Sequence, residues 1–168
     1  MTNEFRLEEP MDREEVYRIH QNAFQRNDEA DLVEKLRSNS QFNSKLSFVA
    51  LRDGKLVGHI LFTPVLIDSK STSSLALAPI SIVREYHRQG IGSQLMQYAL
   101  NEVKAQGYSA VIVLGHENFY PRFGFLPAKN FQLRPSFPLE RENCYMVLEL
   151  IPNEVPQGVV QYLPEFGL

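Results

Sequence analysis

Residues 75–114 change their hydrophobic period twice, and this change constrains the fold more than any other feature of the sequence. The segment reads as a strand, a glycine-rich turn, an amphipathic helix and a second strand, over 75–83, 84–92, 93–106 and 110–114. The last of these is a continuous apolar run, which is typical of a strand buried on both faces. A strand–helix–strand order implies a right-handed crossover between parallel strands. The segment therefore predicts a sheet with a helix packed against it.

The other segments read as two helices and several antiparallel strands. An acidic cap at Asp12 with a Glu three residues later resembles a capping box and predicts a helix over about 12–24. Asn27 or Asp28 would cap a second helix. Asp53-Gly54 is a strong type I′ hairpin signal. Further strands are expected over 5–7, 46–51, 56–67, 144–151 and 159–163, with a polar link over 68–74 and a loop over 127–143. No repeat or linker is visible, so one α+β domain over 1–168 is expected.

Composition excludes several classes of protein. Of the 168 residues 43% are hydrophobic and 22% are charged, which is too apolar and too weakly charged for a disordered chain. One cysteine cannot form an internal disulfide or a Cys-rich zinc site, and four scattered histidines show no metal spacing, so no metal is expected. No apolar run approaches about 18 residues and the N-terminus does not resemble a signal peptide, so a cytoplasmic protein with no membrane partner is expected. A net charge of −3 argues against a nucleic-acid partner.

The negative charge is concentrated near the N-terminus. Residues 1–40 hold ten of the twenty acidic residues and six of the seventeen basic ones. Two interpretations stay open: solvated faces of the two predicted helices, or a surface that faces a cationic substrate.

The glycine-rich turn is the first candidate binding site. Gly90 and Gly92 have no Cβ atoms, so the backbone can turn sharply there and a ligand can approach it closely. The first amides of the following helix have no intrahelical acceptor and lie at the positive end of the helix dipole, so they suit a phosphate or pyrophosphate. Neither a P-loop lysine nor the third glycine of the dinucleotide fingerprint is present. The residues alone leave open a structural turn or a generic nucleotide site.

Two motifs in order resemble those of the GNAT acetyltransferase superfamily. Residues 87–92, His-Arg-Gln-Gly-Ile-Gly, resemble its Gln/Arg-x-x-Gly-x-Gly/Ala diphosphate motif between the fourth strand and the third helix. Residues 119–125, Phe-Tyr-Pro-Arg-Phe-Gly-Phe, are similar to the signature of one bacterial branch, the YhbS-like N-acetyltransferases. Similarity to that branch extends over nearly the whole chain, including 32–37, 57–60 and 158–162. The resemblance implies a mixed, mostly antiparallel central sheet with helices on both faces and a splayed strand pair that holds acyl-CoA.

The resemblance also implies a set of cofactor contacts, with acetyl-CoA as the co-substrate. The backbone of the fourth strand would pair with the pantetheine arm at Ile80, Ser81 and Ile82. The turn and the helix start would hold the pyrophosphate, at His87, Arg88, Gln89, Gly90, Ile91, Gly92 and Ser93. Tyr120 falls where the tyrosine of the family approaches the CoA sulfur. A phenol of pKa about 10 stays protonated at neutral pH and can donate a proton to the departing thiolate.

The sequence departs from the family pattern in several places. His87 stands where Gln or Arg is usual, which would make one cofactor contact weaker or dependent on pH. Arg84 stands where the branch commonly has Pro. Val113 replaces the Asn that many members carry seven residues before Tyr120, and Asn118 of the shortened turn is the expected substitute contact.

The general base and the acetyl acceptor are weakly marked. Many members use a Glu on the fourth strand, but residues 75–83 contain no acidic residue. His59, His116 and Glu117 are candidate bases, and water could also carry the proton away. The acceptor site is expected near the first two helices and their link, which forms either a mobile wall of the site or an ordinary loop. The candidate substrate-binding residues are Phe24, Arg26, His59 and Glu117.

Two functions therefore stay open. The first is an acetyl-CoA-dependent N-acetyltransferase, in which a primary amine of a small molecule or a protein attacks the thioester directly in a ternary complex. The alternative is a GNAT-fold module that binds acyl-CoA for a sensing or structural role and transfers little. Because dimers are common in the family, a homodimer is a further hypothesis.

Overall fold

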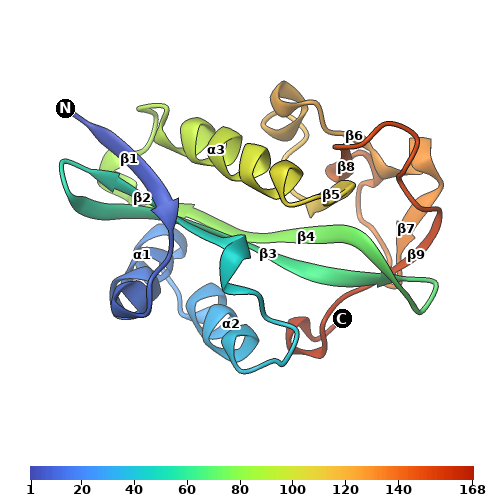
Figure 1. Ribbon diagram of the computed structural model, residues 1–168, viewed down its shortest axis with the longest axis horizontal. Coiled ribbons are helices and arrows are strands. Elements are labelled where there is room, and N and C mark those ends of the chain that lie inside the picture. The colour runs from blue at the N-terminus through green and yellow to red at the C-terminus, as the bar shows by residue number, and fades with distance from the viewer. The chain divides into compact units, whose positions relative to one another are not determined.

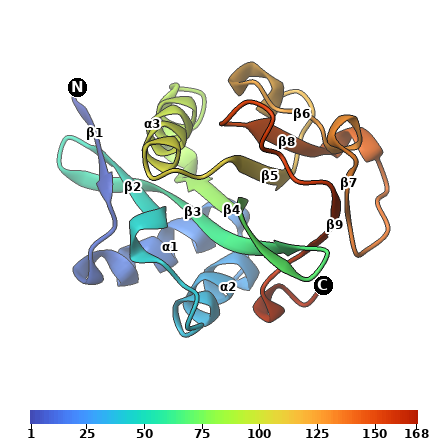
Figure 2. The same cartoon turned by 45° about the vertical axis from the view of Figure 1, so that its right-hand side comes forward.

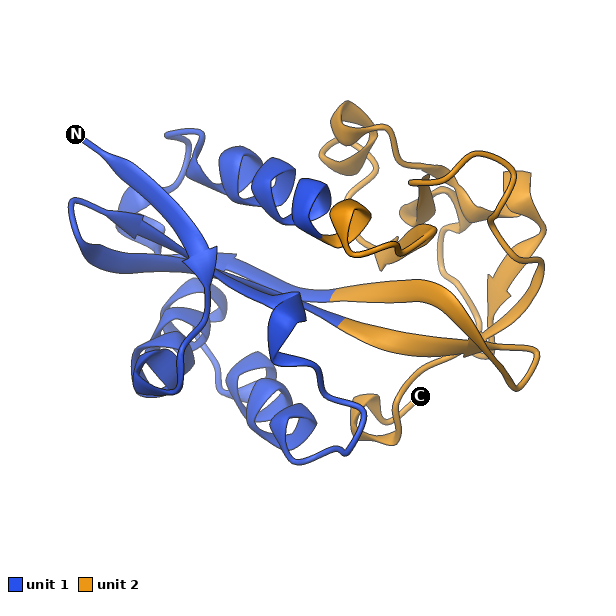
Figure 3. Ribbon diagram, viewed as in Figure 1, with its two compact units in different colours: residues 1–62, 78–102 blue, residues 63–77, 103–168 orange.

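A computed structural model describes residues 1–168, which divide into two compact units (Figure 3). Unit 1 consists of residues 1–62 and 78–102, and unit 2 of residues 63–77 and 103–168. Strands β3 (Lys55–Ile67) and β4 (Lys70–Ile82) and helix α3 (Ile91–Ala105) each contribute residues to both units. A single domain over the whole chain stays a prediction.

Unit 1 is a sheet with helices on both faces (Figure 1). Besides its parts of β3, β4 and α3, it contains β1 (Asn3–Leu7), α1 (Arg13–Phe24), α2 (Asp28–Arg37) and β2 (Ser47–Arg52). The strands neighbour one another in the order β1-β2-β3-β4, and the β1–β2 and β2–β3 pairs are antiparallel. Helices α1 and α2 cover one face and α3 covers the other. No helix combines the length and the apolar character needed to cross a membrane.

Strand β2 shows why unit 1 needs helices on both sides of its sheet. All six of its residues are buried, and alternate side chains face opposite layers. The Phe48 ring meets Tyr98 of α3 edge-on, with ring centroids 5.9 Å apart. The neighbouring Val49 clusters instead with Val16 of α1. The predicted hairpin after β2 is confirmed, since Asp53 and Gly54 have φ values of 51° and 82°.

The predicted capping box at the start of α1 is wrong in its detail. Asp12 occupies the N-cap position, but its carboxylate makes no cap bond to the helix. It accepts the Glu9 backbone N–H at 2.8 Å and two bonds from the Arg6 guanidinium at 2.7 and 3.1 Å. The carboxylate therefore pins the chain that enters α1, rather than the first turn of the helix.

Unit 2 is built on its parts of β3 and β4 with five further strands. These are β5 (Ala110–Leu114), β6 (Leu126–Pro127), β7 (Leu133–Pro135), β8 (Tyr145–Glu149) and β9 (Gly158–Gln161). The order is β4-β5-β8-β6, and β9 pairs with both β3 and β7 (Figure 2). The β4–β5 and β7–β9 pairs are parallel, while β5–β8, β6–β8 and β3–β9 are antiparallel. The predicted mixed, mostly antiparallel α+β fold with a parallel crossover is confirmed.

The parallel pair β4–β5 separates after a short ladder. Its pairing runs from Ser74 and Ala110 to Ala76 and Ile112. Strand β5 stays paired with β8 as far as Leu114, while β4 continues as a strand to Ile82. Pairing between the two strands therefore ends at Ala76 and Ile112, and the splayed arrangement of the pair stays a prediction.

Two segments of unit 2 are more regular than predicted. The expected polar link over 68–74 is a two-residue hairpin turn, in which Asp68 and Ser69 have φ values of 49° and 63°, and β4 begins directly after it. The Asp68 carboxylate accepts the Val159 backbone N–H at 2.8 Å. The expected loop over 127–143 contains β7, which pairs with β9. Both features depend on partners distant in the sequence, so local patterns do not reveal them.

Replacement of Gly158 by alanine tests the hairpin turn. Gly158 has a φ of 135°, and a Cβ on it would overlap the Asp68 carboxylate. Gly158→Ala should lower the free energy of unfolding by about 2 kcal/mol or more, measured by urea denaturation. Gly54→Ala is the matched control, since its Cβ would meet nothing and only the backbone penalty of about 1 kcal/mol remains. Equal losses in the two variants would contradict the packing argument.

Candidate active site

The glycine-rich turn connects β4 to α3 within unit 1. Arg88 and Gly90 adopt left-handed conformations, with φ values of 62° and 82°, and α3 begins immediately afterwards at Ile91. The amides of the first helical turn have no acceptor within the helix and lie at the positive end of its dipole. The backbone here is therefore suited to an anionic group.

Close packing joins the turn to β4. The Ile82 side chain lies 3.5 Å from the position that a Cβ on Gly92 would occupy. A Cβ on Gly58 of β3 would overlap the same isoleucine. Gly58 is therefore needed to let the end of β4 lie tightly against β3, whereas a Cβ at Gly92 would make only an ordinary contact with Ile82.

Residues of β1 and β2 hold the glycine-rich turn and the start of α3 in place, and no sequence pattern marked them for this role. The Arg52 guanidinium donates to the Gln89 side chain at 3.1 Å and lies over the Tyr86 ring, 5.6 Å from its centroid. Asn3 donates to Gln94 of α3 at 2.8 Å. These contacts link segments about 40 to 90 residues apart, so no local pattern predicts them.

His87 makes a contact within the protein. Its Nε2 lies 2.6 Å from the carbonyl oxygen of Ile82. Because a carbonyl can only accept, Nε2 carries the hydrogen. The ring therefore ties the turn to β4, at one of the three residues predicted to pair with pantetheine. Its predicted cofactor contact stays a prediction.

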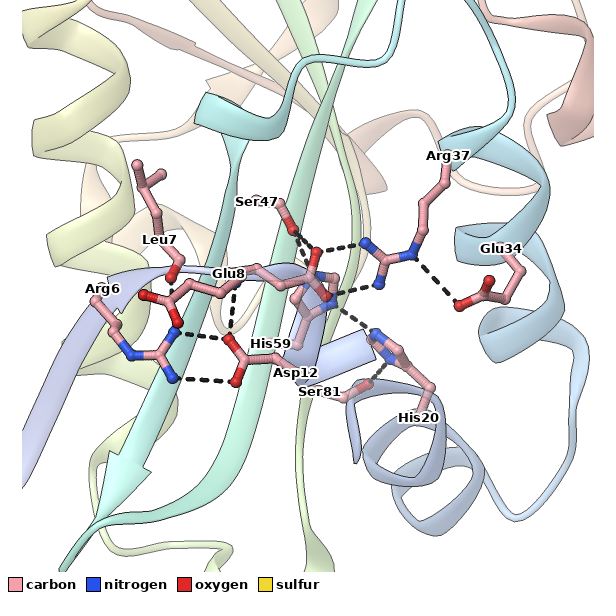
Figure 4. A network of polar contacts seen from close by, with 11 residues as sticks. Arg6, Leu7, Glu8, Asp12, His20, Glu34, Arg37, Ser47, His59 and Ser81 are labelled. Carbon is pink, nitrogen blue, oxygen red and sulfur yellow. Dashed lines mark hydrogen bonds and ion pairs between the residues drawn. The ribbon is translucent and has the colours of Figure 1, made fainter. Parts of the chain in front are cut away.

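A continuous row of buried hydrogen bonds crosses unit 1 from β4 toward the N-terminal strand (Figure 4). We call it the buried polar chain and define it as Ser81, His20, His59, Ser47 and Glu8. Ser81 Oγ lies 2.7 Å from His20 Nδ1, and His20 Nε2 lies 2.8 Å from His59 Nδ1. His59 Nε2 lies 2.7 Å from Ser47 Oγ, which donates to Glu8 Oε1 at 3.0 Å. Of these five residues, only His59 was predicted to have a chemical role for its side chain.

Both histidines of the chain are wholly buried and neutral. Burial, reinforced by His59, lowers the pKa of His20 to about 2. Burial, reinforced by the Arg37 charge, lowers the pKa of His59 to about 3. His59 has no exposed surface, so the function proposed below includes no direct contact between it and an acceptor.

Tyr120 lies in unit 2, in the turn that follows β5. It opens the short helix η4 (Tyr120–Phe123) and is 8% exposed. Its ring meets Phe119 and Phe125 edge-on, with centroids 5.1 and 5.6 Å away, and covers Gly115, where any Cβ would overlap the ring. Burial raises its pKa to about 12, so the phenol stays a proton donor at neutral pH.

The other candidate residues of this turn have partners on the surface. Glu117 forms an ion pair with Arg141, which holds its carboxylate away from a free role as a base. Asn118 is exposed, and its backbone oxygen accepts a 3.4 Å bond from Arg122. The turn thus presents Asn118 to solvent while it buries Tyr120.

The candidates from the link between α1 and α2 lie at the surface of unit 1. Phe24 is 37% exposed and stacks on His20, with ring centroids 6.4 Å apart. Arg26 donates two bonds to Glu29 at 2.9 and 2.5 Å. The structure thus places Phe24 beside the buried polar chain and holds Arg26 against the start of α2.

The sequence profile of the acetyltransferase (GNAT) family matches residues 13–125, a span that includes the turn, Tyr120 and the Phe-Gly-Phe ending of the signature. The chain belongs to this family. Family membership identifies it as an acyltransferase. The matched span begins at α1 and ends before β6.

Relatives of this acetyltransferase cover almost its full length. The uncharacterized N-acetyltransferase YjhQ of Escherichia coli K12 is 33% identical over 151 residues, covering 87% of this chain and 83% of the relative. The uncharacterized N-acetyltransferase YhbS of the same strain is 30% identical over 165 residues, covering 96% and 97%.

Two solved structures share the fold of this acetyltransferase and carry a coenzyme. Escherichia coli YhbS in complex with CoA has a TM-score of 0.91 and 30% identity, covering 99% of this chain and 92% of that one. A GNAT acetyltransferase from Brucella melitensis in complex with acetyl-CoA has a TM-score of 0.81 and 29% identity, covering 98% of both chains. The predicted superfamily and branch are confirmed.

The buried histidines predict how the stability of this acetyltransferase depends on pH. A histidine whose pKa falls on folding binds its proton more tightly in the unfolded chain, so stability is full above pH ~6.5 and declines as the pH falls below it. Each of His20 and His59 should contribute a slope of up to about 1.4 kcal/mol per pH unit, followed by urea unfolding between pH 7.5 and 5. His59→Gln should flatten the slope. An identical slope in the wild type and in His59→Gln would contradict the burial argument.

Proposed function

We propose that this protein is an acetyl-CoA-dependent N-acetyltransferase that acts on a primary amine. The observation that carries the proposal is the turn at Arg88 and Gly90, whose two left-handed residues lead directly into the N-terminus of α3. The CoA and acetyl-CoA complexes of the two structural neighbours support it. A primary amine attacks the thioester directly, with amine and acetyl-CoA bound at the same time.

The strand end and the turn bind acetyl-CoA in this proposal. The backbone of residues 80–82 pairs with the amides of the pantetheine arm, and the turn over 87–93 holds the pyrophosphate. Main-chain amides suit this task because they offer several donors without loss of side-chain entropy. Asn118 adds a side-chain contact from the turn before Tyr120.

The acetyl transfer needs one proton removed and one supplied. The neutral amine attacks the carbonyl carbon, and the tetrahedral intermediate collapses with cleavage of the C–S bond. Tyr120 gives its proton to the departing thiolate, a role that its raised pKa supports, since the phenol stays protonated. The proton lost by the amine nitrogen restores the phenol.

The acceptor is a primary amine of a small molecule or of a protein. Phe24, Arg26 and Glu117 are its proposed contacts. A cytoplasmic location and a homodimer stay predictions.

A second candidate function has a specific observation in its favour. No acidic residue lies on the part of β4 that precedes the turn, His59 is buried, and Glu117 is ion-paired. Of the three candidate bases only His116 is exposed. A GNAT-fold module that binds acyl-CoA without transfer would need no exposed base. Tight CoA binding without thiol release across a broad panel of amines would favour this module over the enzyme.

A negative charge at the helix start tests the cofactor site. Acetyl-CoA should raise the melting temperature, while ATP and NAD should not. Ser93→Glu should keep the stability of the free protein, since a carboxylate in the first turn of α3 is favourable to the helix dipole. It should nevertheless weaken acetyl-CoA binding about tenfold or more by repelling the pyrophosphate, measured by calorimetry. Gln97→Glu, one turn further along α3 and exposed, is the matched control.

Removal of the Tyr120 hydroxyl tests the general acid. Tyr120→Phe should lower kcat by about 100-fold and leave the KM for acetyl-CoA within about twofold, measured by thiol release. Tyr145→Phe serves as the control, because it removes a buried hydroxyl that bonds Tyr162 at 2.7 Å. Unchanged kcat in Tyr120→Phe across the pH range would remove Tyr120 from the mechanism.

A further inference from the structure

A pocket of about 500 Å³ lies at the end of β5, wholly within unit 2. We call it the β5 pocket. Its lining includes the apolar side chains of Leu114, from β5, and of Phe137, Pro138 and Leu139, from the segment before β8. Pockets that hold small organic molecules are mostly apolar and have volumes of about 300 to 1,000 Å³. The β5 pocket is therefore suited to an apolar group of modest size.

The two walls of the β5 pocket are held in place by contacts within the protein. The Gly115 backbone N–H donates to the Cys144 carbonyl at 2.9 Å, which joins the end of β5 to the segment before β8. The ion pair between Glu117 and Arg141 joins the same two segments at a second point. Phe137 packs against the apolar core of unit 2. The pocket is therefore formed before a ligand arrives, which lowers the entropic cost of binding.

The β5 pocket and the proposed general acid lie on opposite sides of the same backbone. A Cβ on Gly115 would overlap the Tyr120 ring, so the side-chain direction of this residue faces Tyr120. Successive side chains of an extended chain point in opposite directions, so Leu114, which lines the pocket, points away from Tyr120. A molecule in the pocket would therefore lie beside the residues that Tyr120 covers, on the other face of β5.

The charges around the β5 pocket favour a cation over an anion. Its two charged side chains are those of Glu140 and Arg141. Arg141 is paired with Glu117, whereas Glu140 is exposed and has no ion-pair partner. The uncompensated charge is therefore negative, and it attracts an ammonium group more than a carboxylate.

We propose that the β5 pocket binds the acetyl acceptor, and that this acceptor is a small primary amine that carries an apolar chain or ring. The proposal rests on the acetyl transfer proposed above and names the substrate class of that reaction. The apolar group fills the space beside Leu114, Phe137 and Leu139. Glu140 attracts the ammonium form of the amine from solution.

A series of straight-chain amines tests the apolar part of the proposal. These amines differ little in basicity, so the series varies chain length alone. At saturating acetyl-CoA, kcat/KM should rise by about threefold for each methylene from ethylamine to hexylamine, because each added methylene is removed from water. Ethanolamine and spermidine should be poor acceptors, since each would place polar groups against the apolar wall.

Replacement of Leu114 tests the position of the acceptor. Leu114→Gln should lower the ratio of kcat/KM for hexylamine over ethylamine by about tenfold, because it places an amide in the apolar wall. The ratio cancels any common effect on folding or on coenzyme binding. Leu126→Gln is the matched control: Leu126 is 50% exposed, like Leu114 at 52%, and does not line the pocket. Its ratio should equal that of the wild type.

Alkylation of Cys144 gives a readout that needs no turnover. Cys144 is the single cysteine of the chain, is partly exposed and lines the β5 pocket. Hexylamine at several times its Kd should slow the reaction of Cys144 with iodoacetamide by about fivefold, measured by mass spectrometry. Ethanolamine should give no protection because it lacks the apolar chain, and hexanoate none because its charge is negative.

The outcomes separate the pocket from the proposed function. Equal kcat/KM for ethylamine and hexylamine, equal ratios in Leu114→Gln and Leu126→Gln, or a lysine peptide that is preferred to hexylamine would overturn the pocket assignment while the acetyltransferase stands. A preference for hexanoyl-CoA over acetyl-CoA would overturn it too, because the pocket would then hold the acyl chain. Protection of Cys144 by hexylamine without thiol release from any amine would overturn the proposed function, and the acceptor role of the pocket with it.

Discussion

The ion pair between Arg37 and Glu8 is the contact on which the interior of unit 1 depends. Both side chains are almost wholly buried, 7% and 4% exposed, and two parallel bonds join them. A buried polar group is costly unless it is hydrogen-bonded. The pair therefore supplies the final acceptor for a row of side chains that would otherwise end inside the protein without a partner. Loss of Glu8 would remove both of its bonds to Arg37, which would keep only Glu34, and would leave the Ser47 hydrogen without its acceptor.

The buried polar chain also joins elements that the sheet alone does not tie together. Its members come from β4, α1, β3 and β2 and from the segment after β1, so one row of bonds fixes the helical layer to the sheet. On the opposite face the contact is apolar, where Phe48 and Tyr98 join β2 to α3. On the α1 side of unit 1 the row of hydrogen bonds thus lies among apolar contacts such as that of Val16 with Val49, while an aromatic contact joins the α3 side.

The sequence predicted the elements whose signals are local. Three such elements are confirmed: the strand at the apolar run Ala110–Leu114, the Asp53-Gly54 turn and the amphipathic helix α3. The signal of each depends on neighbours within a few residues. The motifs and their order also predicted the family. The sequence did not predict the Asp68-Ser69 turn, because the turn lacks glycine and is held by a bond from the backbone of the distant Val159.

The candidate site was predicted less completely, for a physical reason. A motif marks residues that bind through the backbone, such as the turn at Gly90, because glycine is chemically unusual there. Ser47, His20 and Ser81 are ordinary residues in the sequence and become a set only when β2, α1 and β4 pack together. The sequence suggested His59 as a base or an acceptor contact, because it is a lone histidine in a predicted strand. In the structure it is wholly buried and hydrogen-bonded to His20 and Ser47.

The support that β1 and β2 give to the glycine-rich turn has a practical consequence for anyone who handles the protein. Asn3 holds Gln94, and the guanidinium of Arg52 contacts both Gln89 and the Met1 sulfur. A purification tag joined ahead of Met1 would therefore begin beside the segment expected to meet the coenzyme diphosphate. Titrations are best compared before and after the tag is cut away.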